Sequence, residues 1–185
     1  MKSMLTLLAV AGAFVLLTRS VPANPIGVVV DHTSDGVVVT ANTEAATIHF
    51  SYDQSCADSK PCYTIDASQG MVGISASASS CTVKNGNGYT PTIIQCPPAG
   101  VGSIQFKFVK GGTWSAYSGG GGQHTGTSCS PARVIVTAGK GVTSIESWDG
   151  CHEIVQCGSL KGSLATVDAD ANDDITGKCA SIVKH

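Results

Sequence analysis

Branched aliphatic residues decide what this chain can fold into. After residue 23 the sequence holds 28 Val and Ile residues but only two Leu, at positions 160 and 164. β-Branched side chains are restricted in helices and pack well on a pleated sheet, so this ratio excludes an ordinary helical domain and predicts short strands. We expect an all-β fold, namely a short β-solenoid or β-roll with an N-terminal β-strand segment, stapled by disulfides.

The first 23 residues have the layout of a secretory signal peptide. A basic second residue precedes an uncharged apolar run from Met4 to Leu17, and Val21 and Ala23 place small residues where a signal peptidase cleaves. We therefore expect cleavage before Asn24 and a secreted, extracellular protein. The apolar run of 14 residues is shorter than the roughly 20 residues that a membrane-spanning helix needs, so we expect no membrane span.

The remaining chain is mildly acidic. Removing Lys2 and Arg19 with the signal leaves 9 basic and 13 acidic residues, a net charge of 9 − 13 = −4. The sequence has no cluster of Lys and Arg interleaved with aromatic residues, so we expect no nucleic-acid partner.

All eight cysteines follow the signal segment, and an even number behind a secretory signal indicates four disulfides. They are Cys56, Cys62, Cys81, Cys96, Cys129, Cys151, Cys157 and Cys179. About 105 pairings of eight cysteines are possible, so the sequence leaves the connectivity open.

Spacing nevertheless favours one pairing of these cysteines. The pairs Cys129–Cys151 and Cys157–Cys179 are both 22 residues apart, as expected for equivalent points on neighbouring coils of a solenoid. Cys56–Cys62 would close a small loop, and Cys81–Cys96 would clamp the turn at 85–88. A zinc–thiolate site would need close Cys-x-x-Cys pairs, which the sequence lacks.

Short apolar runs bounded by Gly, Pro, Asn and Ser predict strands at 28–30, 37–39, 47–52, 63–65, 72–74, 82–83, 93–94 and 103–108. We divide the chain into a signal peptide at 1–23, an N-terminal β segment at 24–110, a Gly-rich loop at 111–128 and degenerate β-roll repeats at 129–185. Trp114 and Tyr117 in the loop could form an exposed aromatic patch, but we favour Trp114 as a cap on the apolar core.

A period of about ten residues runs through the last segment. Ile135, Ile145, Val155, Leu164 and Ile175 follow one another at intervals of 10, 10, 9 and 11 residues. We interpret this as a half-coil repeat in which one branched side chain per half-coil points into a narrow core. Such a core is thin, and the disulfides would compensate for its small area.

Three stretches of the C-terminal segment, at 138–146, 147–158 and 167–179, resemble the repeats of hemolysin-type (RTX-like) calcium-binding β-roll proteins. Segments 37–52 and 81–104 are similar to the small β segment that often precedes such rolls. In that family a nonapeptide G-G-x-G-x-D-x-U-x stacks into a roll, and its Asp carboxylates hold calcium between turns. The resemblance therefore implies a β-roll with calcium as its cofactor.

The chain departs from the family pattern at its key position. Thr143 stands where the nonapeptide has Asp, Glu153 occupies the matching position in the next half-coil, and Asp173 is the one aspartate kept in register. We therefore expect no intact multi-ion roll. One weak calcium site is the sharper prediction, and a solvated acidic turn that blocks an open sheet edge is the alternative. The candidate ligands are Asp149, Glu153, Asp168, Asp170, Asp173 and Asp174.

The sequence contains no Gly-x-Ser-x-Gly elbow, Walker loop, dinucleotide fingerprint or His-Glu-x-x-His helix. We expect a non-enzymatic structural or interaction module that binds an extracellular surface, matrix or host component. The alternative is a small polysaccharide-active or toxin-like enzyme that uses the acidic cluster, because paired carboxylates are the minimum for glycoside hydrolysis. Ice binding would need regular Thr-x-Thr ladders, which the sequence does not contain.

Overall fold

The architecture comes from a computed structural model of the chain. The structure describes residues 26–185 except for 45, 57–58, 69–72, 77–79, 86–90, 99, 118–128, 140, 142 and 159–163. The expected signal peptide lies outside the described residues.

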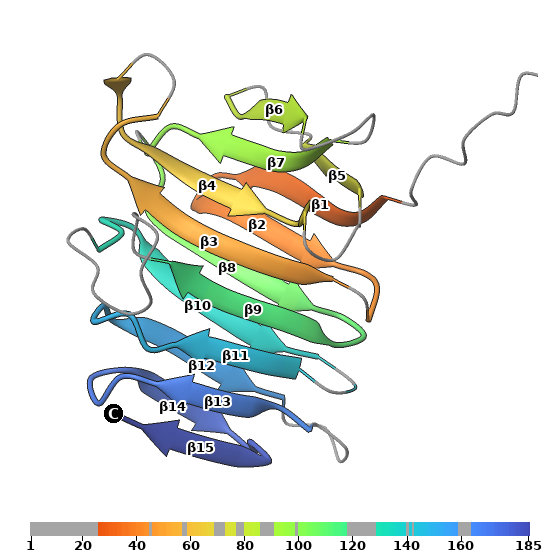
Figure 1. Ribbon diagram of the computed structural model, residues 1–185, viewed down its shortest axis with the longest axis vertical. Helices are drawn as coiled ribbons and strands as arrows, with labels where there is room; N and C mark the ends of the chain where they lie inside the picture. Colours follow the sequence, from red (N-terminus) through yellow and green to blue (C-terminus); the bar gives the residue numbers. More distant parts are fainter. Residues whose placement is uncertain are drawn as a thin grey trace, which may run out of the picture.

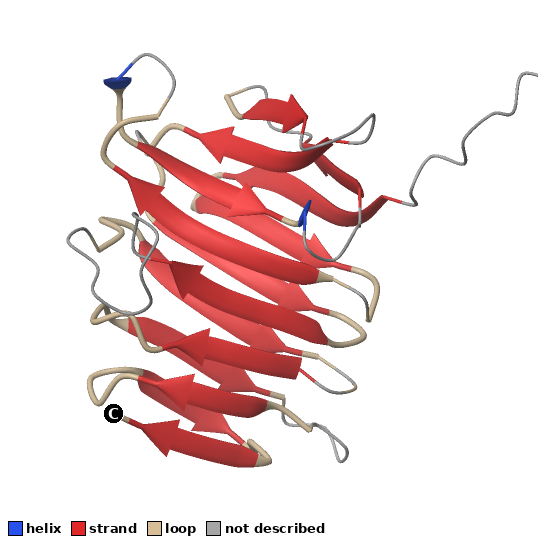
Figure 2. Cartoon of the chain, in the orientation of Figure 1, coloured by secondary structure: helices blue, strands red, loops and turns tan. Residues whose placement is uncertain are grey.

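The described chain is built almost wholly from strands, which form two sheets (Figure 2). They are β1 (Ile26–Thr33), β2 (Gly36–Ala41), β3 (Thr47–Asp53), β4 (Cys62–Asp66), β5 (Gly73–Ala76), β6 (Thr82–Asn85), β7 (Pro91–Cys96), β8 (Ser103–Phe108), β9 (Gly112–Tyr117), β10 (Arg133–Ala138), β11 (Thr143–Ser147), β12 (Glu153–Cys157), β13 (Thr166–Ala169), β14 (Asp174–Gly177) and β15 (Ser181–Lys184). The strands expected in the N-terminal segment are confirmed as β1 to β8.

Successive strands from β8 onward alternate between the two sheets. Sheet A has the order β14-β12-β10-β8-β2-β1-β5, and sheet B has the order β15-β13-β11-β9-β3-β4-β7-β6. Within each sheet, neighbouring strands of this part pair in parallel. The earlier strands β2 and β3 join the same pattern, because β2 pairs in parallel with β8 and β3 with β9.

We call each consecutive pair of strands a coil: β2–β3, β8–β9, β10–β11, β12–β13 and β14–β15. The coils follow one another along the long axis of the molecule, with the C-terminus at one end (Figure 1). At the other end, β1 pairs antiparallel with β2, and β4, β7 and β6 extend sheet B by antiparallel pairing. The strands at the C-terminal end, β14 and β15, are edge strands.

The core lies between the sheets and is filled largely by alternate residues of the strands, whereas the last two strands, β14 and β15, are mostly exposed. In sheet B the inward column Ile48, Trp114, Ile145 and Val167 is at most 2% exposed. Trp114 is fully buried, with its ring centroid 5.6 Å from that of Phe106 in sheet A. The expectation that Trp114 contacts the core is confirmed, although it lies in the middle of the core rather than at its end.

The inward residues of the last coils differ in part from those expected. Val155 and Ile145 are buried and face inward, but Ile135 lies between the buried residues Val134 and Val136 and faces outward. Leu164 is 52% exposed and precedes β13. The prediction for Ile135 was wrong because neighbouring residues of a strand point to opposite faces, so an error of one position places a side chain on the other face. The prediction for Leu164 was wrong because this residue lies outside the strand, where Val167 is the buried partner of Ile145.

The boundaries of the segments also differ from the sequence-based division. Residues 112–117 of the expected Gly-rich loop form β9, which lies between β3 and β11 in sheet B. The rest of that loop, 118–128, lies outside the described residues. The coils are not confined to 129–185 either, since β2–β3 and β8–β9 belong to the same two sheets.

All four disulfides have the pairing that the spacing favoured. Cys129–Cys151 and Cys157–Cys179 join neighbouring coils with Cα–Cα distances of 5.4 and 5.1 Å. The other two disulfides, Cys56–Cys62 and Cys81–Cys96, lie at the end of the molecule where the strands pair antiparallel. Four disulfides are typical of proteins that fold in an oxidising compartment.

In the part of the chain that the structure describes, no helix has the length and apolar character needed to cross a membrane.

Candidate functional site

Four of the predicted acidic ligands gather at one corner of the stack. We call Asp149, Glu153, Asp170 and Asp173 the acidic corner; it lies where β11 leads into β12 and β13 into β14. Three of the four side chains are buried, with exposed fractions of 6% for Asp149, 3% for Glu153 and 3% for Asp173.

The inward column of sheet A explains this burial. Val37, Ile104 and Val134 occupy the column in successive coils, and Glu153 pairs with Val134 at the same inward position. Asp173 directly precedes β14, and its carboxylate accepts a hydrogen bond from the Glu153 amide. The apolar column therefore ends at an acidic residue, Glu153, with a second acidic residue beside it.

The Asp173 carboxylate is held by three donors. Oδ2 accepts hydrogen bonds from the Ser147 hydroxyl at 2.7 Å and the Asp170 amide at 3.0 Å, and Oδ1 accepts one from the Glu153 amide at 2.8 Å. Ser147 ends β11 and Glu153 begins β12, so two of these donors lie on either side of the β11–β12 turn. Asp173 therefore joins the β13–β14 turn to the β11–β12 turn.

Asp170 and Asp149 make similar bonds. Oδ2 of Asp170 accepts from the amides of Asp149 at 2.9 Å and Gly150 at 2.6 Å, and Oδ1 of Asp149 accepts from the Cys151 amide at 2.8 Å. Buried backbone N–H groups need acceptors, and these carboxylates supply them where the chain turns from one sheet to the other.

Glu153 differs from the three aspartates. Its Oε2 atom is buried and has no hydrogen-bond partner in the described chain. The pKa of Glu153 is raised from 4.5 to about 9, first by burial and then by the neighbouring charges of Asp149 and Asp173, a hydrogen bond with Asp173, and the charge of Asp170. Glu153 is therefore protonated at neutral pH.

The other two predicted ligands lie elsewhere. Oδ1 of Asp168 is 2.7 Å from Nε2 of His185, whose ring stacks on Trp148 at a centroid distance of 3.9 Å. Oδ2 of Asp174 is 3.3 Å from Nε2 of His152. Both aspartates occupy outward strand positions, so the prediction that all six acidic residues form one cluster was wrong for these two.

The geometry of the acidic corner does not resemble a calcium cage. Calcium takes six to eight oxygen ligands that converge on one point. Among the described residues, the one group of three His, Cys, Asp or Glu side chains whose ligand atoms lie within 4.8 Å of one another is Asp53, Cys56 and Cys62. Its two cysteines form a disulfide. The arrangement favours hydrogen-bonded turns, and calcium binding stays a prediction.

A row of hydroxyl groups on the outward face of sheet B was missed by the sequence analysis. The register of the parallel strands aligns one outward Thr or Ser from each coil: Thr47, Thr113, Ser144, Thr166 and Ser181. We call this row the hydroxyl ladder. Its members are partly or fully exposed. Neighbouring strands are about 4.8 Å apart, so the hydroxyls recur at about that interval.

The sequence conceals the ladder because its members are 66, 31, 22 and 15 residues apart. Beside it runs a second outward column in which His49, Ser115, Glu146 and Asp168 are register partners. His49 Nδ1 is 2.6 Å from the Ser115 hydroxyl, and the Glu146 side chain is exposed.

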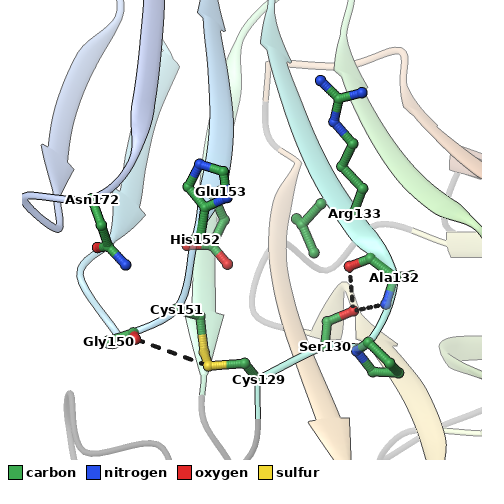
Figure 3. A pocket seen from close by; sticks show the side chains of 11 residues that line it. Cys129, Ser130, Ala132, Arg133, Gly150, Cys151, His152, Glu153 and Asn172 are labelled. Carbon is green, nitrogen blue, oxygen red and sulfur yellow. Dashed lines mark hydrogen bonds between the residues drawn. A yellow bond between two sulfur atoms is a disulfide. The ribbon is translucent and has the colours of Figure 1, made fainter.

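A cavity of about 520 Å³ lies beside the acidic corner, next to the Cys129–Cys151 disulfide. One side is formed by residues 130–134, and the other by residues 150–153 and Asn172. Glu153 and His152 lie between Asn172 and Arg133 (Figure 3). The cavity therefore combines a largely apolar wall with a buried carboxyl group.

Comparisons of the chain with protein-family models, with curated proteins and with solved structures find no match.

Proposed function

We propose that this chain is a secreted, non-enzymatic β-solenoid that binds an insoluble, hydroxyl-rich extracellular matrix through the outward face of sheet B. The alternation of strands between two sheets supports a solenoid, because each coil then adds one strand to each sheet. The four disulfides and the signal-like N-terminal segment support secretion.

The hydroxyl ladder is the observation that carries the proposed binding face. Each Thr or Ser hydroxyl can donate one hydrogen bond and accept two, so it complements the hydroxyl groups of a polysaccharide. The exposed Glu146 carboxylate next to the ladder adds an acceptor for such hydroxyls. One hydrogen bond of this kind contributes little binding free energy in water. A rigid row of hydroxyls can form several of them at once with a polysaccharide whose hydroxyl groups recur at regular intervals.

The acidic corner supports a structural role rather than catalysis. The carboxylates of Asp149, Asp170 and Asp173 are occupied by internal donors, and Asp149 and Asp173 are buried. A glycoside hydrolase needs two carboxyl groups that flank a bound sugar. Under our proposal these residues instead fix the turns that connect the two sheets.

A partition experiment tests the proposed function. Purified oxidised protein is mixed with crystalline cellulose or chitin, and the fraction left in solution is measured. We expect saturable retention on at least one of these solids, without release of soluble sugars. The double variant Thr113→Val/Thr166→Val removes two hydroxyls from the ladder but keeps branched side chains on the strands, and we expect it to weaken retention several-fold.

A matched control lies on the opposite sheet. Thr40 and Thr176 are outward residues of sheet A, so Thr40→Val/Thr176→Val removes two hydroxyls from the other face. This variant should be retained like the unmodified protein. The proposal would be contradicted by an equal loss of retention in both variants or by retention on neither solid. Release of soluble sugars would also contradict it and would support the alternative of a polysaccharide-active enzyme. Inhibition of ice growth with no retention on either solid would identify the ladder as an ice-binding face instead.

A further inference from the structure

The C-terminal end of the stack presents two open strand edges. β14 is the last strand of sheet A and β15 the last of sheet B, so among the described strands each pairs with a neighbour on one side only. The outer side of such a strand carries a row of backbone N–H and C=O groups that another strand can bind. Both edges lie at the same end of the molecule (Figure 1).

The apolar core extends to this open end. Ile182 is the register partner of Val167, so it continues the inward column of sheet B. The earlier members of that column are at most 2% exposed, whereas Ile182 is 49% exposed and the adjacent Val183 is 50% exposed. Burial of this apolar surface on association would be favourable.

Both strands are short, which limits the contact, but other features that protect an edge from pairing are missing. Neither strand contains Pro, and the registers of β14 with β12 and of β15 with β13 run without a bulge. A lysine often guards an edge, but Nζ of Lys184 donates to the carbonyl oxygens of Ala171 and Asp173. This side chain therefore folds back onto the turn before β14.

The opposite end of the stack does not offer a matching surface. There β5, the edge of sheet A, packs against β6 and β7, the last strands of sheet B. The inward residues Ile74 and Ile94 of this end are at most 2% exposed. A head-to-tail contact would therefore set an open end against a closed one, whereas two copies of the open end match each other.

The last coil is complementary to itself when two copies are antiparallel. Thr176 and Ile182 each lie three residues from Cys179, the middle of the connection, so they lie at about the same level of the coil. A two-fold axis through both levels sets Asp174, at the start of β14, opposite Lys178 of the second copy. It also sets Ile182 opposite its own counterpart. Opposite charges and exposed apolar residues therefore meet in the same register.

We propose that two copies of this chain associate through their open ends, with β14 paired to β14 and β15 paired to β15 in antiparallel orientation about a two-fold axis. Such a contact is closed, because each copy uses its open end, and it forms dimers rather than longer chains. The interface is small, so we expect a dissociation constant on the order of 1–100 µM.

The axis also fixes how the proposed binding faces are arranged. It runs across the two sheets, so sheet B of one copy continues into sheet B of the other, and both hydroxyl ladders lie on the same side of the dimer. A matrix that binds one ladder would then engage two at once, which raises the overall affinity. This consequence rests on the proposed function, but the dimer itself does not.

Sedimentation equilibrium tests the association without any matrix. The purified oxidised chain, with no tag at its C-terminus, is measured over a range of roughly 1–500 µM, which spans the expected dissociation constant. We expect the average mass to rise from one chain to two and no further. Amide signals of β14 and β15 in NMR spectra should shift on dilution, and those of β3 should stay unchanged.

An exposed aliphatic residue in the middle of the stack provides a matched control. Ile182→Lys places a charge at the centre of the contact and should weaken the dimer about tenfold or more. Val109→Lys makes the same kind of change directly after β8, where Val109 is 48% exposed, and should leave the dimer unchanged.

A charge exchange tests the orientation of the two copies. Lys178→Asp sets like charges opposite each other at both ends of the β14 pair and should weaken the dimer several-fold. The further change Asp174→Lys restores opposite charges and should recover the affinity. Both side chains are exposed, so neither change disturbs the core.

Several results would overturn the proposal. They are a single-chain mass over the whole concentration range, growth beyond two copies, equal weakening by Ile182→Lys and Val109→Lys, and no recovery in the charge-exchanged protein. If Ile182→Lys does not fold, the charge exchange still decides the matter. Retention of single chains on cellulose or chitin would leave the proposed function standing when the dimer fails.

Discussion

The amide of Glu153 donates a 2.8 Å hydrogen bond to Oδ1 of Asp173, 20 residues further along the chain. Glu153 continues the inward column of sheet A after Ile104 and Val134, and Asp173 directly precedes β14, the neighbouring strand of that sheet. The last two coils are therefore joined inside by a carboxylate as well as at their edge by the Cys157–Cys179 disulfide.

Replacing Asp173 should loosen the C-terminal coil. Asp173→Ala leaves the Ser147 hydroxyl and the Glu153 and Asp170 amides without their acceptor, which we expect to cost about 2–4 kcal/mol of unfolding free energy. Urea unfolding measures the change. Asp174→Ala is the matched control, since that exposed side chain pairs with the exposed His152, and its cost should stay below about 0.5 kcal/mol.

Stability should fall as the pH rises from about 5 to 9. The pKa of Glu153 is about 9 in the folded chain against 4.5 as its ordinary value, so between these values the folded chain binds more protons than the unfolded chain. The free energy of unfolding then decreases with pH, by up to about 1.4 kcal/mol per pH unit from this group.

The Glu153→Gln variant isolates that contribution. Gln cannot ionise, so urea unfolding across the pH range should give a flatter profile, with the variant gaining stability relative to the unmodified protein as the pH approaches 9. Identical pH profiles for the two proteins would contradict the assignment of a raised pKa to Glu153.

Two glycines with similar backbone angles should respond differently to a methyl group. Gly177 and Gly150 have φ values of +87° and +84°, which cost an L-residue about 1 kcal/mol. A Cβ at position 177 would overlap the carbonyl oxygen of Cys157, whereas a Cβ at position 150 has no neighbour within 4 Å. Thermal unfolding should therefore show a clearly larger loss for Gly177→Ala than for Gly150→Ala, and equal losses would count against the close contact of β12 and β14.

Calcium should have little effect on stability if hydrogen bonds hold the acidic corner. An ion that binds only the folded chain raises the free energy of unfolding in proportion to the logarithm of its concentration. We expect the same urea midpoint in EDTA and in millimolar calcium. A higher midpoint in calcium that is lost in Asp173→Asn would instead support the calcium site predicted from the sequence.

The sequence was most informative where a pattern is local or covalent. The strands around Val37 and Phe106 follow from runs of branched or alternating residues between turn formers, and the pairing of Cys157 with Cys179 follows from equal spacing. The acidic corner was predicted in part, because Glu153 and Asp173 keep the spacing of the coil.

The remaining features depend on register between strands, which one sequence does not specify. Ile135 was placed in the core because a ten-residue period cannot distinguish it from its neighbours Val134 and Val136. The hydroxyl ladder was missed for the same reason, since Thr113 and Ser144 become neighbours only after a long connection has closed one coil. β9 was read as a loop because its Gly-rich surroundings resemble turns.

Interstrand NOEs test the stacking of the coils most directly, because the hydroxyl ladder, the acidic corner and the cavity all depend on it. The register predicts backbone NOEs between Val136 and Val155, between Val155 and Ile175, and between Ile145 and Val167, with the pattern of parallel strands. NOEs of the antiparallel pattern between β12 and β13 in place of these contacts would show a meander of hairpins and would contradict the account.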